Sequence, residues 1–235
     1  MFRDRDDAAF RLAEQLRERP LIDPVVLGIP RGGVVVAAVL AKALPAELDV
    51  VLARKLRSPN NPEAALGAVA EDGTLVMNPE AERLVAEYPQ YVARERQRQL
   101  AELERRKQLF RSVRPAVSLT GRSVIITDDG IATGSTMAAA LRAARAQRPR
   151  ELIVAVPVAS PDRLTELQPL CDDIVCLEAP EDFWAVGQFY EDFSPVEDRD
   201  VVELLQQATA SRPPCTHATG LDPEGRRTSC APHSA

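Results

Sequence analysis

Apolar and polar residues follow one another along the chain in blocks that predict strands and helices in turn. Residues 4–19 place apolar side chains at helical spacing behind an acidic first turn, which predicts an amphipathic helix. Short apolar runs predict strands at 24–29, 48–56, 123–129, 151–159 and 172–179. Longer runs predict helices at 32–44, 135–147 and 161–170. The alternation predicts an α/β fold with a parallel sheet flanked by helices, in which ligands bind beyond the carboxyl ends of the strands.

Two stretches interrupt this alternation. Residues 57–73, "RSPNNPEAALGAVAEDG", predict a mobile loop that returns through a short strand, to which residues 74–78 would pair. Residues 79–114 are charged and helical in character, and predict one solvated helix, or two with a break at Pro89. A basic face for a partner and an arm of a homodimer are alternative roles for this charged helical insert.

Length, composition and charge bound the function. The chain has 235 residues, of which 45% are hydrophobic, enough for one α/β domain that we place at residues 1–210. A net charge of −6 argues against a broad electrostatic grip on nucleic acid and favours small-molecule partners. No apolar run reaches the roughly 20 residues that span a bilayer, and no signal peptide is evident, so we expect a cytoplasmic protein with no membrane partner.

Histidine and cysteine placement excludes several chemistries. Both histidines lie in residues 211–235, a Pro-, Ser- and Thr-rich tail that we expect to be disordered. Residues 1–210 therefore hold no histidine-based triad and no histidine-ligated zinc site. Cys171 and Cys176 have the spacing of neither a zinc knuckle nor a redox pair, so we expect small buried thiols. One zinc site in the tail stays open as an alternative, with four candidate ligands: Cys215, His217, Cys230 and His233.

The stretch "TDDGIATGST" at 127–136 joins a predicted strand to the start of a predicted helix. A helix start offers unpaired backbone N–H groups and a partial positive charge, which favour an anion by roughly 0.3–1 kcal/mol. Small and hydroxyl-bearing residues would let the backbone curl around a phosphate and donate to it. These residues are Gly130, Thr133, Gly134, Ser135 and Thr136.

Asp128 and Asp129 precede this anion cradle by one turn, so they must face groups that donate hydrogen bonds or carry positive charge. Vicinal sugar hydroxyls and Mg²⁺ both satisfy that requirement. A ribose carrying a 5-phosphate supplies both the anion for the helix start and the hydroxyl donors for the two aspartates. The plainer alternative is an acidic turn followed by an ordinary helix cap.

The segment "VIITDDGIATGST" resembles the signature with which type I phosphoribosyltransferases hold phosphoribosyl pyrophosphate (PRPP). The resemblance implies that Asp128 and Asp129 contact the ribose hydroxyls. It also implies that the loop from Ala132 to Thr136 wraps the 5-phosphate.

Three further segments are similar to motifs of that family. "GIPRGG" resembles the pyrophosphate loop, which would give the backbone amides of Arg31, Gly32 and Gly33 to the leaving group. "ARKL" resembles the place of a basic residue near pyrophosphate, which nominates Lys55, with Arg54 as second choice. Residues 57–73 occupy the position of the flexible loop that closes over the reactants.

Residues 179–193, "APEDFWAVGQFYEDF", resemble the hood of hypoxanthine-guanine enzymes. The resemblance gives Trp184 the role of stacking on the acceptor base and places Glu191 near an acidic position of the same site. A core aromatic that fills the hood is the alternative for Trp184. We place the hood at about 179–198. The motifs and the insert together are typical of the "predicted phosphoribosyltransferase" branch of the family.

The resemblance implies an enzyme that uses Mg²⁺ and PRPP to transfer a ribose 5-phosphate group to a nitrogenous base or similar acceptor, with release of pyrophosphate. The implied catalytic residues are Asp128, Asp129, Arg31 and Lys55. Mg²⁺ would be held mainly through PRPP, with the two aspartates as further ligands.

Two departures leave the acceptor open. Ala132 stands where hypoxanthine-type enzymes have an aspartate, and "VPVASPDR" lacks the lysine with which they read a purine. The second hypothesis is a non-catalytic regulatory protein that binds PRPP or a nucleotide and reports it through the insert, because fold alone does not decide function.

Overall fold

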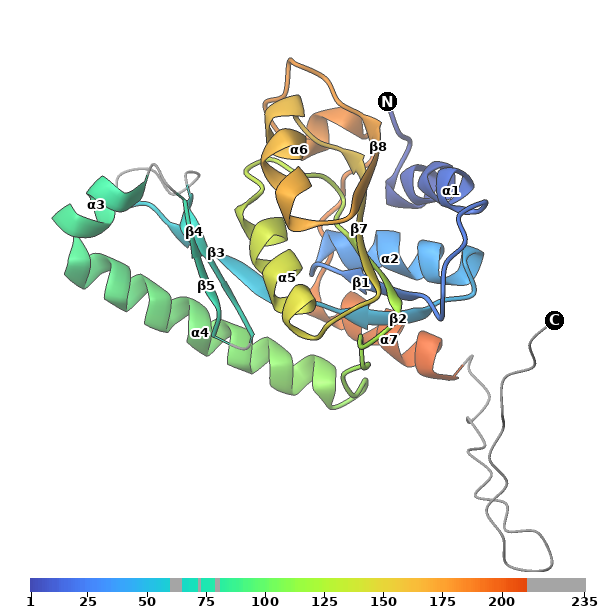
Figure 1. Cartoon of the computed structure of the whole chain (residues 1–235), viewed down its shortest axis with the longest axis horizontal. Coiled ribbons are helices and arrows are strands. Elements are labelled where there is room, and N and C mark those ends of the chain that lie inside the picture. The colour runs from blue at the N-terminus through green and yellow to red at the C-terminus, as the bar shows by residue number, and fades with distance from the viewer. Residues whose placement is uncertain (60–64, 72, 79–80, 211–235) are drawn as a thin grey trace, which may run out of the picture.

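A five-stranded parallel sheet forms the centre of the protein (Figure 1). The computed structural model describes residues 1–59, 65–71, 73–78 and 81–210. Within these ranges the strand order is β2-β1-β6-β7-β8, and every neighbouring pair is parallel. The strands are β1 (Val25–Gly28), β2 (Glu47–Val50), β6 (Ser123–Thr127), β7 (Glu151–Val158) and β8 (Asp173–Glu178). The predicted parallel α/β sheet is confirmed.

Helices cover both faces of this sheet, which explains why its central strands are continuous apolar runs. One layer holds α1 (Arg5–Leu16), α2 (Gly32–Ala43) and α7 (Asp198–Ala210). The other holds α5 (Ser135–Ala146), α6 (Pro161–Leu167) and a short 3₁₀ turn, η2 (Gln168–Leu170). Alternate residues of a strand face opposite layers: Val26 packs with the α1 layer, while Val25 and Leu27 pack with the α5 layer.

A second, three-stranded antiparallel sheet stands beside the first (Figure 1). It consists of β3 (Ala53–Arg57), β4 (Ala65–Ala70) and β5 (Leu75–Met77). The pairing of β4 with β5 confirms the predicted return strand. The single strand predicted at 48–56 is wrong, because the chain leaves the parallel sheet after Val50 and enters the second sheet at Ala53. Val51 and Leu52 between them are buried and apolar, so the hydrophobic pattern carries no boundary there.

The insert forms two helices, α3 (Glu82–Glu87) and α4 (Pro89–Arg111), so the predicted break at Pro89 is confirmed. The expectation of a solvated insert is wrong for α4, which lies along the second sheet (Figure 1). Its side chains Glu95 and Gln99 are only 6% and 3% exposed. Glu95 accepts a hydrogen bond from the Gln99 amide at 2.7 Å, and Gln99 accepts one from Arg54 at 2.6 Å. Paired polar groups therefore form part of this interface.

The hood follows β8 and packs on the N-terminus. Phe2 lies against Tyr190 with ring centroids 5.3 Å apart, and its backbone N–H donates to the Phe189 carbonyl at 2.7 Å. The hood contains one 3₁₀ turn, η3 (Val186–Phe189). Helix α7, where the sequence predicted no element, then buries Val201 and Leu205 against the α2 layer.

Several expectations fall outside the described ranges, namely the tail at 211–235 with its cysteines and histidines, and residues 60–64 and 72 of the closing loop. In the ranges that are described, no helix combines the length and apolar character needed to cross a membrane.

Candidate functional site

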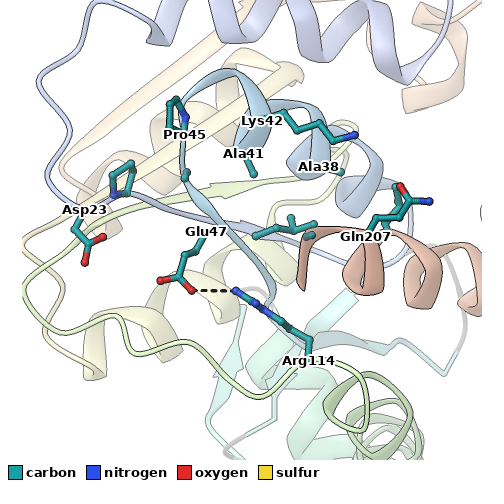
Figure 2. Close-up of a pocket in the computed structure, with 13 residues that line it drawn as sticks. Asp23, Ala38, Ala41, Lys42, Pro45, Glu47, Arg114 and Gln207 are labelled. Carbon is teal, nitrogen blue, oxygen red and sulfur yellow. Dashed lines mark hydrogen bonds and ion pairs between the residues drawn. The ribbon is translucent and has the colours of Figure 1, made fainter. Parts of the chain in front are cut away.

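A cavity of about 350 Å³ lies at the amino-terminal edge of the parallel sheet, between α2 and α7 (Figure 2). Arg114 and Glu47 point toward one another across it, with Nη2 and Oε2 3.0 Å apart. Ligands of open parallel sheets bind at the opposite, carboxyl edge. The candidate site therefore lies at that edge.

A larger cavity, of about 430 Å³, opens at the carboxyl end of β6. It lies between the parallel sheet, the second sheet and the hood, and it brings together residues that are far apart in sequence. The lining residues are Lys55, Asp128, Gly130, Ile131, Ala132, Thr133, Gly134, Thr136, Met137, Phe183 and Trp184.

The loop after β6 folds as a local strand-to-helix turn. The Ile131 N–H donates to the Val158 carbonyl at 2.9 Å, which ties the loop to β7. Gly134 then adopts φ 72°, a left-handed conformation that favours glycine, and α5 begins at the next residue. A Cβ at Gly130 would lie 2.5 Å from Cγ1 of Val186, so the close approach of the hood also requires glycine. The loop thus presents the N-terminus of α5 to the cavity, as predicted for an anion cradle.

Asp128 lines this cavity, and its Oδ1 accepts the backbone N–H of Asp129 at 2.9 Å. Burial raises the pKa of the Asp128 carboxyl well above its ordinary value, and the negative charge of Asp129 raises it further. The site therefore disfavours a second negative charge beside Asp129 and favours a cationic or hydrogen-bonding ligand.

The carboxylate of Asp129 is held by Arg5, whose Nε lies 2.7 Å from Oδ2. The two side chains are only 10% and 15% exposed. The Arg5 guanidinium also donates to the Ser194 carbonyl at 2.9 Å and lies 3.9 Å from the ring centre of Phe193. Sequence reasoning missed Arg5, because nothing in an amphipathic helix 124 residues away signals this pairing.

The hood also holds the acidic turn by its backbone. The Tyr190 hydroxyl donates to the Asp129 carbonyl at 2.6 Å. Burial raises the pKa of the Tyr190 phenol, so it stays protonated and keeps donating.

The glycines of "GIPRGG" lie directly against the two aspartates. A Cβ at Gly32 would lie 1.9 Å from Oδ2 of Asp129, and one at Gly33 would lie 2.9 Å from Oδ1 of Asp128. Helix α2 begins at Gly32, so its N-terminal N–H groups lie near the acidic turn. The Arg31 side chain turns instead to Glu197, 3.2 Å away, and does not line the cavity.

Adjacent residues of β3 face opposite ways. Lys55 lines the cavity, whereas Arg54 points to α4 and donates from Nε to the Gln99 amide oxygen. This alternation leaves Lys55 as the candidate cation for an anionic ligand, ahead of Arg54.

Of the two hood residues predicted to bind the acceptor, one lines the cavity and the other does not. Trp184 lines the cavity and is 88% exposed, so it is not a core aromatic. Glu191 is exposed and lies outside the cavity lining. Ser135 is buried and donates from Oγ to the amide oxygen of Asn78 at 3.3 Å. Of the three loop hydroxyls, those of Thr133 and Thr136 belong to residues that line the cavity.

The comparisons with known proteins identify the family of the chain. The phosphoribosyl transferase domain family matches residues 4–194. The chain belongs to this phosphoribosyl transferase family. Its resemblance to type I phosphoribosyltransferases is thus confirmed at the level of family and fold.

Similar proteins include two provisionally named phosphoribosyl transferases of Mycobacterium tuberculosis, from strains CDC 1551 and H37Rv. Each is 44% identical over 211 residues, which cover 88% of this chain and 47% of the relative. The chain therefore spans about half the length of these relatives. The crystal structure of TT1426 from Thermus thermophilus is 48% identical, with a TM-score of 0.75, and the match covers 88% of this chain and 98% of that one.

Cys171 and Cys176 are free, and burial raises the pKa of each thiol to about 11, so both stay protonated at neutral pH. The prediction of small buried thiols is confirmed for Cys171, whereas Cys176 is half-buried. Among the described residues, no group of three or more His, Cys, Asp or Glu side chains is arranged to hold a metal ion.

Proposed function

We propose that the chain transfers a ribose 5-phosphate group from PRPP to a nitrogenous base or similar acceptor and releases pyrophosphate. The observation that supports this most is the convergence on one cavity of Asp128, Lys55 and the N-terminus of α5. Membership of the phosphoribosyl transferase family supports the reaction class.

Each part of the cavity would have its own role. The loop from Ala132 to Thr136, at the start of α5, would hold the 5-phosphate. Asp128 would bind the ribose hydroxyls. Asp129 is already engaged by Arg5, so it would assist mainly by fixing the turn.

The reaction would break the bond from ribose C1 to the pyrophosphate oxygen, whose electron pair leaves with pyrophosphate. The lone pair of the acceptor nitrogen would form the new bond to C1. Negative charge thus grows on the leaving group, where the Lys55 ammonium and the amides of Gly32 and Gly33 would stabilise it, with Arg31 nearby. Each well-aimed donor would lower the barrier by roughly 2.7–4 kcal/mol, by analogy with oxyanion-hole donors.

A divalent cation fits this site if the substrate supplies most of its ligands. The described residues hold no protein-only metal cluster, and the carboxylates at the cavity are Asp128 and its neighbour Asp129. Mg²⁺ bound with PRPP would neutralise charge on the diphosphate. Asp128 would then be the protein residue placed to contact it.

Calorimetric titration with PRPP, with and without Mg²⁺, tests the pocket. We expect Mg²⁺-dependent binding to the wild-type protein and at least about tenfold weaker binding to Asp128→Asn, since a hydrogen bond to a charged group contributes about 1.5–3 kcal/mol. Asp6→Asn is the matched control, because Asp6 is exposed on α1 and is not among the residues that line the cavity. Absence of PRPP binding in a folded protein would reject the proposal.

Pyrophosphate release with a panel of nitrogenous bases then separates catalysis from sensing. Release that depends on both PRPP and a base identifies a transferase and its acceptor. Magnesium-dependent PRPP binding without release from any base would favour the second hypothesis, a regulatory protein that keeps the pocket and has lost the reaction.

A further inference from the structure

A cationic cleft lies between β3 and α4, on the face of β3 that points away from the candidate active site. Its volume is about 350 Å³, and its charged lining consists of four arginines and one glutamate, a net charge of +3. The whole chain carries −6, so this positive charge is a local feature. The charged residues are Arg54, Arg57, Arg98, Glu102 and Arg105.

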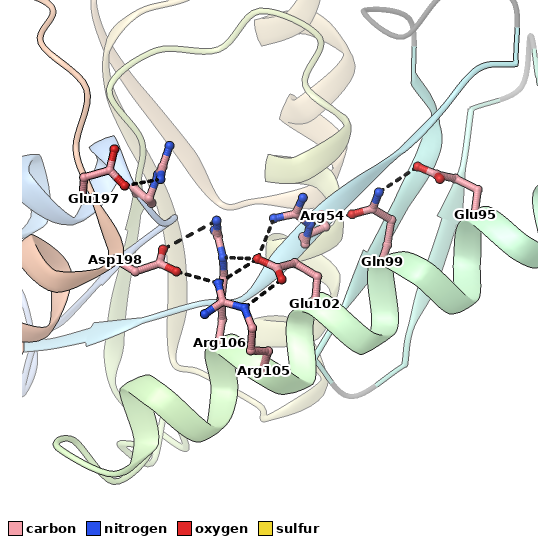
Figure 3. Close-up of polar contacts among 9 residues, drawn as sticks. Arg54, Glu95, Gln99, Glu102, Arg105, Arg106, Glu197 and Asp198 are labelled. Atoms are coloured by element: carbon pink, nitrogen blue, oxygen red, sulfur yellow. Dashed lines mark hydrogen bonds and ion pairs between the residues drawn. The ribbon is translucent and has the colours of Figure 1, made fainter.

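The single acid of the cleft is already fully engaged (Figure 3). Glu102 accepts hydrogen bonds from Arg105 at 2.9 Å and from Arg106 at 3.0 Å, and lies 3.9 Å from Arg54. The hydrogen bond from Arg105 is the main cause that lowers the pKa of Glu102 to about 2. Its charge therefore cannot also neutralise the remaining arginines.

Two arginines of the cleft have no anionic partner among the residues that the structure describes. In the part of the chain that the structure describes, the side chains of Arg57 and Arg98 form neither a hydrogen bond nor an ion pair. Burial lowers the pKa of Arg54, and the positive charges of Arg106 and Arg57 lower it further. Among the described residues, the positive charges of Arg57 and Arg98 therefore remain uncompensated in the cleft, whereas Arg105 is paired with Glu102 and Asp198.

We propose that this cleft binds a phosphorylated small molecule that carries two or more adjacent phosphate groups. Arginine presents planar, forked donors that match phosphate oxygens, and several adjacent negative charges are needed to balance the lining. Because Arg54 faces the cleft while Lys55 faces the other cavity, the two sites are separate. The proposal therefore stands independently of the proposed transferase reaction.

A nucleic acid is the less suitable occupant. It requires an extended positive surface that follows its phosphate backbone. Two cationic side chains further along α4 are instead bound by acids of the fold, since Arg106 contacts Asp198 and Arg111 contacts Asp49. Arg94 and Arg96 of α4 form no ion pair with a described residue either, but both are exposed and neither lines the cleft.

Calorimetric titration with inorganic tripolyphosphate tests the site in the full chain. The cleft variant is Arg57→Gln with Arg98→Gln. The matched control is Arg94→Gln with Arg96→Gln, which removes the same charge from exposed positions of α4 outside the cleft. We expect binding to the wild-type protein, at least about tenfold weaker binding to the cleft variant, and less than about twofold change in the control.

Two results would overturn the proposal. Equal affinity of the wild-type protein and the cleft variant would place tripolyphosphate elsewhere, for example in the candidate active site. Equal losses in both double variants would show a diffuse effect of surface charge. A single-stranded RNA oligonucleotide serves as the third probe: tighter binding than tripolyphosphate, weakened alike by both double variants, would assign the surface to nucleic acid.

Discussion

Replacing Arg5 with glutamine would remove the positive charge that holds Asp129 in the acidic turn. The Arg5–Asp129 pair joins α1 to the loop after β6 at 2.7 Å, and both side chains are largely shielded from water. Without Arg5, the Asp129 carboxylate would stand uncompensated beside Asp128, whose own pKa is already raised by burial. The substitution should therefore destabilise the fold as well as the site.

The expected loss can be bounded from the surroundings of the pair. Exposed ion pairs contribute about 0–1 kcal/mol, whereas removing one partner of a fully buried pair costs about 3–5 kcal/mol. Exposed fractions of 10% and 15% place this pair nearer the buried limit. Arg5 also loses its contact with the Phe193 ring, worth about 0.5–2 kcal/mol and not strictly additive. We expect the free energy of unfolding to fall by about 2–4 kcal/mol.

Urea denaturation of Arg5→Gln and Arg11→Gln measures this difference. Arg11 lies on the same helix and pairs with Asp7 at 2.7 Å, but its side chain is 50% exposed and Asp7 keeps a second partner in Arg3, so its loss should cost less than about 1 kcal/mol. Adding Asp129→Asn to Arg5→Gln removes the orphaned carboxylate and should recover part of the loss. Equal destabilisation by the two arginine variants, or no recovery in the double variant, would refute the reasoning.

Three further changes test other contacts. Folding raises the pKa of Asp128, so the free energy of unfolding of the wild-type protein should fall as the pH rises from the unfolded pKa near 3.9 through the folded pKa. Urea unfolding of Asp128→Asn at several pH values should lack that fall. Parallel plots of stability against pH for the two proteins would contradict this. Gly67→Ala places a Cβ 2.1 Å from the Val76 carbonyl oxygen and should cost about 1–3 kcal/mol by urea unfolding, whereas unchanged stability would contradict the strand packing. Trp184→Ala should leave the melting temperature unchanged and raise the KM for an acceptor base about tenfold; an unchanged KM would remove Trp184 from the acceptor site.

The parts of the site that the sequence predicted are those encoded locally. The segment from β6 to α5 contains an apolar strand, two acidic residues, two glycines and a helix start within 14 consecutive residues, so the sequence pattern alone predicts it. The break at Pro89 is equally local, because proline fits the first turn of a helix and not its interior. Such features depend on residues that are close in sequence, so they can be predicted without knowing the tertiary structure.

The parts that were missed depend on distant partners. The boundary between β2 and β3 lies inside a continuous apolar run, since burial continues while the strands change sheet. Glu95 and Gln99 look like solvent-facing residues, and only their contacts with β3 explain their burial. Arg5 has the same character, because its role follows from α1 lying over the acidic turn.

The strand order explains how the separate motifs meet. β1 and β6 are neighbours, with Gly28 opposite Thr127, so the glycines after β1 and the aspartates after β6 reach the same edge of the sheet. Between these motifs the chain first forms α2 and β2, then leaves the parallel sheet after Val50 to form the second sheet, α3 and α4, and returns at Ser123. Because β3 is packed between α4 and α5, that excursion delivers Lys55 to one cavity and Arg54 to the other. One strand thus supplies Lys55 to the candidate active site and Arg54 to the proposed second anion site.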